Sequence, residues 1–197
     1  MSARAADVII VGGGIMGAAT AFFLAKRGRS VILLERDLIG QYASGTNFGN
    51  VRRQGRFLPQ LPLANRSREI WGRLPALIGE DVEFLPSGHV RVAFGQGDAD
   101  QLESYAQEAR RYDLELEILS GNRLRDRFPF LSTQAVAGSY SPLDGHANPR
   151  LAAPAFGRAA RRACARLNET TEDDANEWTT EALQGVTHGA PAIRAPA

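Results

Sequence analysis

The chain has 197 residues, of which 44% are hydrophobic and 23% charged, values typical of a soluble globular protein of one or one and a half domains. Its 23 basic and 22 acidic side chains give a formal net charge of +1, which argues against nucleic acid or an anionic membrane as a partner. The single cysteine, Cys164, excludes an internal disulfide, and the sequence lacks a membrane span or cleavable signal pattern, so we expect a cytoplasmic protein.

The first forty residues predict a strand, a helix and a second strand. Residues 8–11 form a β-branched apolar run, which is typical of a strand buried on both faces of a parallel sheet. Apolar residues then recur at helical spacing from Ile15 onward, Gly28 provides a helix stop, and residues 31–34 are apolar again. This order is that of a βαβ unit.

A glycine motif joins the first strand to the helix, with Gly12, Gly14 and Gly17 in the spacing GxGxxG. These glycines allow a tight turn, a close approach of a pyrophosphate and close packing of helix on strand. Glu35 ends the second strand, where a carboxylate accepts hydrogen bonds from an adenosine ribose and disfavours the 2′-phosphate of NADP. The pattern predicts an ADP-binding turn but does not separate FAD from NAD, and the alternative is a glycine-rich turn in an unrelated α/β sheet.

A loop rich in Gly, Ser and Asn follows at residues 43–57, with the sequence ASGTNFGNVRRQGRF. It offers hydroxyl, amide and guanidinium groups suited to binding phosphate or carboxylate. Together with the stretches GGGIMG and LLER, this loop resembles the D-amino-acid-oxidase-like flavoproteins, especially the sarcosine oxidase type. The resemblance implies FAD as the cofactor and an incomplete α/β fold, in which a Rossmann-type FAD-binding βαβ unit is joined to part of an α+β substrate domain.

The resemblance also implies which residues hold the cofactor. In the family the glycine turn holds the FAD pyrophosphate, the acid that ends the second strand holds the ribose, and the Ser-Gly-Thr loop reaches the middle of the cofactor. The matching positions here are Gly12, Gly14, Ile15, Met16, Gly17, Glu35, Arg36, Ser44, Gly45 and Thr46. Arg52 lies where sarcosine-oxidase-like members carry an arginine that can pair with a substrate carboxylate; the alternative is an exposed loop arginine.

Beyond this loop the pattern leaves the parallel sheet. The predicted elements are an amphipathic helix at 63–78, a hairpin at 82–94 that turns at residues 86–88, a helix capped by Asp98, a strand at 116–119 and a short helix stopped by Pro129. We assign no catalysis to His89. Asp144 and His146 are interpreted as neighbours in a capped turn, in preference to an acid–base pair.

Residues 144–166 resemble the segment by which the family re-enters the FAD domain. Asn148 is a suitable N-cap and Pro149 a suitable first helical residue, whereas Pro154 is expected to bend the helix or delay its start. We therefore divide the chain into a βαβ unit with its flavin loop (1–60), a partial substrate domain (61–143), a re-entry helix (144–166) and a tail (167–197).

The character of the chain changes after Leu167. The last 31 residues hold six acids and one arginine and show no strand periodicity, a composition that favours a disordered or weakly helical tail. We expect the resemblance to end here, which suggests a reading frame disturbed near residues 164–168 and a truncated chain.

The resemblance implies an FAD-dependent oxidoreductase that acts on the C–N bond of a small secondary amine or amino acid, as sarcosine oxidases and D-amino-acid dehydrogenases do. That amine or amino acid is the expected partner molecule, and the activity of this chain alone stays open. One alternative is a non-catalytic nucleotide-binding fragment or subunit that needs another chain. The other is an NAD-linked dehydrogenase.

Overall fold

The computed structural model describes residues 6–169 and divides the chain into two compact units. Unit 1 comprises residues 1–46 and 149–197, and unit 2 comprises residues 47–148. The sequence placed the divisions after residues 60, 143 and 166, so the flavin loop from residue 47 onward belongs to unit 2. The predicted tail lies almost entirely outside the described residues.

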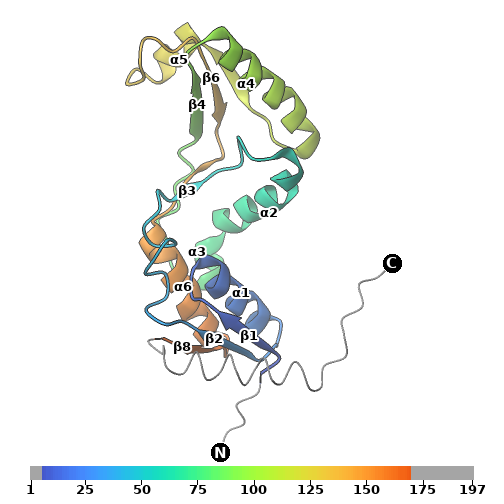
Figure 1. The fold of residues 1–197 in the computed structure, drawn as a ribbon, viewed down its shortest axis with the longest axis vertical. Helices are drawn as coiled ribbons and strands as arrows, with labels where there is room; N and C mark the ends of the chain where they lie inside the picture. The colour runs from blue at the N-terminus through green and yellow to red at the C-terminus, as the bar shows by residue number, and fades with distance from the viewer. Residues whose placement is uncertain (1–5, 170–197) are drawn as a thin grey trace, which may run out of the picture. The chain divides into compact units, whose positions relative to one another are not determined.

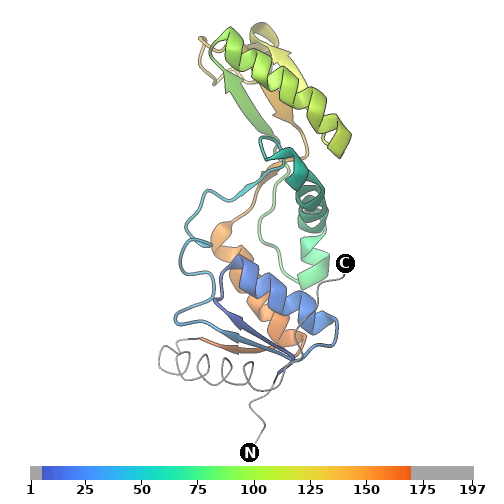
Figure 2. The ribbon, with the colours of Figure 1, turned by 45° about the vertical axis from the view of Figure 1, so that its right-hand side comes forward.

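Unit 1 is a parallel sheet with two helices on one face (Figures 1 and 2). Its elements are β1 (Val8–Val11), α1 (Ile15–Lys26), β2 (Val31–Leu34), α6 (Pro149–Arg162) and β8 (Arg166–Asn168). The sheet order is β1-β2-β8, with Val8 opposite Val31 and Ile32 opposite Arg166. The predicted strand–helix–strand order is therefore confirmed.

The core of unit 1 forms between β2 and the two helices. All four residues of β2 are buried, as expected for a strand with a neighbour on each side and helices above it. Phe22 and Phe23 of α1 pack against Phe156 of α6, with ring centroids 5.9 and 6.2 Å apart. The helix α6 thus completes a core that the first forty residues only begin.

Two expectations for this unit need correction. The sequence predicted no strand after Leu167, yet Arg166–Asn168 form β8, which pairs in parallel with β2. This short strand has no periodicity of its own and forms because β2 offers it a backbone ladder. The helix α6 begins at Pro149 as predicted, and Pro154 lies inside it without delaying its start.

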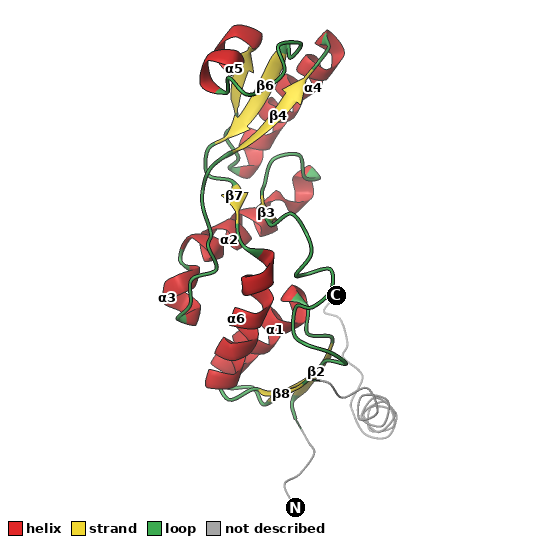
Figure 3. Cartoon of the chain, turned by 90° about the vertical axis from the view of Figure 1, so that its left-hand side faces the viewer, coloured by secondary structure: helices red, strands yellow, loops and turns green. Residues whose placement is uncertain are grey.

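Unit 2 contains an antiparallel sheet of three strands, in the order β4-β6-β5, with α4 packed along it (Figure 3). Its elements are β3 (Asn50–Val51), the 3-10 turn η1 (Leu58–Gln60), α2 (Leu61–Gly72), α3 (Leu74–Ile78), β4 (His89–Ala93), α4 (Gln96–Ala109), the 3-10 turn η2 (Arg110–Tyr112), β5 (Glu117–Ser120), α5 (Gly121–Arg127), β6 (Ala137–Ser141) and β7 (Gly145–His146). The strands β3 and β7 form a separate antiparallel pair. The predicted strand at 116–119 and the helix that ends before Pro129 are confirmed.

Three predicted elements of unit 2 differ from those observed. The helix at 63–78 is divided into α2 and α3 at Arg73, because Pro75 has no N–H and its ring would clash with the preceding turn of a continuous helix. The hairpin at 82–94 is wrong: β4 pairs with β6 along its whole length, and Leu85 makes only an isolated bridge to His146. The N-cap of α4 is Gly95, which leaves Asp98 in the first turn.

Candidate functional site

The glycine turn between β1 and α1 is closed by backbone contacts that leave no room for side chains. Gly12 has φ +100° and its amide donates to the carbonyl oxygen of Leu34, at 2.8 Å. A Cβ atom on Gly17 would lie 1.9 Å from the carbonyl oxygen of Gly12, so helix and turn approach each other only because residue 17 is glycine. A Cβ on Gly12 itself would meet nothing within 4 Å, so space lies open beside the turn.

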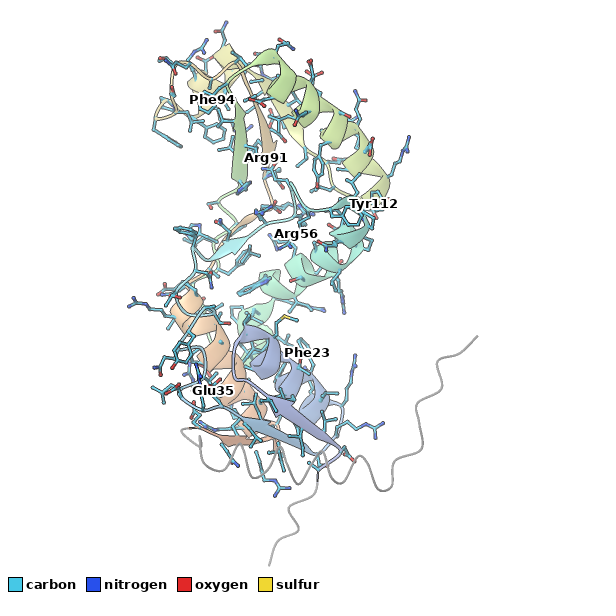
Figure 4. The ribbon with its side chains drawn as sticks, in the orientation of Figure 1. Phe23, Glu35, Arg56, Arg91, Phe94 and Tyr112 are labelled. Atoms are coloured by element: carbon cyan, nitrogen blue, oxygen red, sulfur yellow. The ribbon has the colours of Figure 1, made fainter. Side chains whose placement is uncertain are left out.

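Glu35 lies at the end of β2 and reaches back to this turn (Figure 4). Its Oε2 accepts a hydrogen bond of 2.6 Å from the amide of Gly13, and its Oε1 accepts one of 3.0 Å from the amide of Asp37. The carboxylate therefore holds the glycine turn and the start of the next loop together. It lies beside the turn, where the sequence placed it.

Ser44 joins the same cluster from the loop that follows β2. Its Oγ accepts a hydrogen bond of 2.9 Å from the amide of Ile15, the first residue of α1. A Cβ on Gly14 would lie 2.9 Å from this Oγ, and one on Gly45 would lie 2.2 Å from the carbonyl oxygen of Gly40. The small residues at 14 and 45 thus allow the loop to close on the N-terminus of the helix.

Gly40 is a contributor that sequence reasoning missed. It has φ +80°, and its amide donates to the carbonyl oxygen of Gly13, at 3.0 Å. A Cβ there would lie 3.0 Å from the Cβ of Ala153 in α6. Its only local signal is a glycine in the loop after the second strand, which many turns share.

Three other predicted residues lie away from the centre of this cluster. Arg36 is exposed, lies 3.5 Å from Asp37 and has its guanidinium 5.0 Å from the centre of the Tyr42 ring. Met16 is 79% exposed in the first turn of α1. Thr46 donates its hydroxyl hydrogen to the carbonyl oxygen of Tyr42, at 3.2 Å. The structure thus brings together the glycines, Ile15, Glu35 and Ser44 more tightly than the remaining candidates.

The chemistry of this cluster, which we call the cradle (residues 12–17, 35 and 44), fits a nucleotide diphosphate. Backbone amides and the positive end of a twelve-residue helix face one place, and the first turn of α1 contains no acidic residue that would repel an anion. The turn approaches a ligand with backbone only, since residues 12–14 are glycines. A carboxylate lies beside it to accept hydrogen bonds from hydroxyl groups.

Arg52 belongs to unit 2 and its guanidinium Nη1 donates to the carbonyl oxygen of Gln54, at 2.7 Å. The loop that carries it is fixed by Asp144, which is fully buried. Asp144 accepts hydrogen bonds from the amides of Arg53 and Gln54, at 2.8 and 3.1 Å, and from Arg53 Nε, at 2.9 Å. Asp144 is therefore a structural anchor for residues 52–54, a contact that spans 91 positions and has no sequence signal.

His89 lies in the same buried polar network. Its Nδ1 lies 2.8 Å from Nε2 of Gln54, whose Oε1 accepts a hydrogen bond of 3.0 Å from the Ser139 hydroxyl. Burial lowers the pKa of His89, and the positive charges of Arg52 and Arg91 lower it further, against the opposing effect of Asp144. A neutral imidazole can accept the Gln54 hydrogen bond at Nδ1, so the network favours the uncharged ring.

No helix within residues 6–169 is long and apolar enough to cross a membrane. The sequence matches the model of the family described as FAD dependent oxidoreductase over residues 7–195. The match continues beyond Leu167, so the expectation that the resemblance ends there is wrong.

Similar proteins include glycine oxidase of Geobacillus kaustophilus, which is 34% identical over 84% of this chain and 46% of its own. One of the subunits of opine oxidase from Rhizobium meliloti is 29% identical over 93% of this chain and 52% of its own. The crystal structure of glycine oxidase from Bacillus cereus is 29% identical, with a TM-score of 0.73 over 84% of this chain and 46% of that one. The chain thus spans about half the length of the relatives it matches.

Proposed function

Because the chain belongs to the family of FAD-dependent oxidoreductases, we propose that its cradle binds the ADP half of FAD. The convergence of Glu35 and Ser44 on the glycine turn carries this proposal. The amides of Gly13 and Ile15, at the positive end of α1, would face the pyrophosphate, and Glu35 would accept hydrogen bonds from the ribose hydroxyls.

The other residues assigned from the sequence take smaller parts in this proposal. Gly12, Gly14 and Gly17 let the backbone and helix approach the cofactor, while Gly45 lets the Ser44 loop close. Arg36, Met16 and Thr46 would border the cofactor from the cradle's rim. Each of these three rim assignments predicts a smaller loss of FAD affinity on substitution than Gly14 or Glu35 does.

For the whole protein we propose oxidation of the C–N bond of a small amine or amino acid. This proposal follows relatives such as glycine oxidase and the N-methyl-L-tryptophan oxidase of Salmonella typhi. Bound FAD would supply the chemistry by accepting a hydride from the carbon beside the amine. Arg52 would bind a substrate carboxylate, because a guanidinium grips a planar carboxylate with two parallel hydrogen bonds and stays charged at any working pH.

A titration with FAD tests the cradle directly. The wild-type chain is expected to bind FAD with a change in its visible absorbance, whereas Gly14→Val is expected to lose binding because its side chain would collide with Ser44. Gly97→Val is the matched control, since an added Cβ there meets nothing within 4 Å. Equal FAD affinity in all three proteins would contradict the cradle.

A second candidate is a nucleotide-binding component that is active only with another chain. The similarity to the opine oxidase relative favours it, since that protein is named as one subunit of an oxidase. It predicts that the chain binds FAD but that no amine or amino acid reduces the bound flavin under anaerobic conditions. Bleaching of the flavin absorbance by glycine or sarcosine would decide for the complete activity. We propose a cytoplasmic location in either case.

A further inference from the structure

Unit 2 contains a small pocket lined by four arginines. Its volume is about 100 Å³, and its walls include Ser67 and Trp71 of α2. The arginines are Arg52, Arg53, Arg56 and Arg68. A water molecule occupies about 30 Å³ of liquid, so the pocket has room for about three waters or one carboxylate or phosphate group.

The positive charge of this pocket is largely uncompensated. Arg53 forms an ion pair with Asp144, at 2.9 Å, and within residues 6–169 this is the one ion pair that any of the four arginines makes. The remaining protein acceptors of Arg52, Arg56 and Arg68 are neutral backbone carbonyl oxygens. Three guanidinium charges therefore share a pocket without a carboxylate of their own.

The arginines are also held in place before any ligand binds. Arg56 uses its Nε to donate to the carbonyl oxygen of Arg52, at 3.0 Å. Arg68 donates from Nε to the carbonyl oxygen of Leu143, and its guanidinium lies 4.8 Å from the centre of the Phe84 ring. Because these bonds occupy Nε, the two Nη groups of Arg56 and of Arg68 remain as donors for a ligand. Guanidinium groups fixed in this way lose little freedom when they bind an anion.

The neighbours of Arg68 show the electrostatic cost of this arrangement. Burial lowers the pKa of Arg68, and the positive charge of Arg53 lowers it further, with Asp144 acting in the opposite direction. A bound anion would offset this repulsion between like charges.

We propose that this pocket is an anion-binding site that takes a single carboxylate or phosphate group through Arg52, Arg56 and Arg68. Such a group can come from a carboxylate-bearing small molecule or from a phosphorylated one, and both offer oxygens that pair with guanidinium N–H groups. The site goes beyond the proposed function, since its residues all belong to unit 2 and the cradle belongs to unit 1. It shares only Arg52 with that proposal.

Calorimetric titration of the 197-residue chain with sodium phosphate and with sodium acetate, at ionic strength held constant with sodium chloride, tests the site. We expect saturable binding that Arg68→Gln weakens by about tenfold, the equivalent of one hydrogen bond to a charged group. Arg66→Gln is the matched control, because Arg66 lies on the same helix, is exposed and pairs with Glu69. Tighter binding of phosphate assigns the site to a phosphorylated ligand, and tighter binding of acetate assigns it to a carboxylate.

Arg56→Gln provides a second test, because Arg56 is exposed and its loss does not threaten folding. The same weakening is expected there. Absence of saturable binding to either anion, or equal affinities in Arg56→Gln, Arg66→Gln and the wild type, would overturn the proposal. The FAD titration of Gly14→Val separates the two sites, since that variant is expected to lose FAD and keep the anion.

Discussion

At the scale of single residues, the buried pair of Arg53 and Asp144 carries the largest testable energy. Asp144 is fully buried and binds two amides as well as the guanidinium. The variant Asp144→Asn removes the charge and leaves Arg53 buried without a counter-ion, so we expect a loss of about 3–5 kcal/mol in the free energy of unfolding. Urea denaturation measures this loss.

The control for this prediction is Glu117→Gln, which breaks the exposed ion pairs with Arg123 and Arg127. Exposed pairs contribute about 1 kcal/mol or less, so this variant should unfold close to the wild type. A similar urea midpoint for Asp144→Asn and Glu117→Gln would show that the buried charge does not stabilise unit 2.

Two helical glycines allow a matched pair of substitutions. Alanine is the better helix former by up to about 1 kcal/mol, so Gly97→Ala, which meets no neighbour, should leave the chain unchanged or slightly more stable. Gly17→Ala adds the same methyl group against the carbonyl oxygen of Gly12 and is expected to destabilise the chain by about 2 kcal/mol. Thermal unfolding of the two variants compares them, and an equal effect would contradict the close approach of turn and helix.

At the scale of elements, the success of sequence reasoning depends on whether a contact is local. The order β1, α1, β2 follows from patterns within thirty residues, and so does the placing of Glu35 beside the glycine turn. The pairing of β4 with β6 joins residues about fifty positions apart, and no local pattern could favour it over a hairpin. The anchor of Arg53 on Asp144 is equally remote, so the sequence could name Arg52 but could not predict the pocket around it.

The contact between β4 and the loop of residues 52–54 makes stability depend on pH. The pKa of His89 is lowered from 6.5 in the folded chain, so the unfolded chain binds more protons on this residue as the pH falls. The stabilisation is fully present above about pH 6.5 and is lost as the pH falls through that value toward the folded pKa. Urea midpoints of the wild type should therefore drop between about pH 7.5 and pH 5.

Other groups also titrate over this range, so the variant His89→Gln isolates the contribution of the ring. Gln54 lies against His89, while Arg52 and Arg91 disfavour its charged form. The variant should show a shallower fall in stability than the wild type over the same range of pH. Parallel curves for the two proteins would mean that His89 is protonated equally in the folded and unfolded chains.

At the scale of the whole molecule, unit 1 is built from two segments of chain separated by unit 2. The helices α1 and α6 pack together through Phe22, Phe23 and Phe156, and β8 extends the sheet from β2. Neither segment can bury its apolar face alone, so the two should open as one cooperative unit. A ligand that binds only the first segment should then stabilise both.

Hydrogen exchange with and without FAD measures this coupling. FAD bound at the cradle is expected to slow exchange of the amides of α1, and to slow those of α6 by a similar factor although α6 begins over a hundred residues later. The variant Gly14→Val, which should not bind FAD, provides the baseline. Slower exchange confined to α1 would mean that the two segments open separately, and the discontinuous unit would then be two weakly coupled parts instead of one folded body.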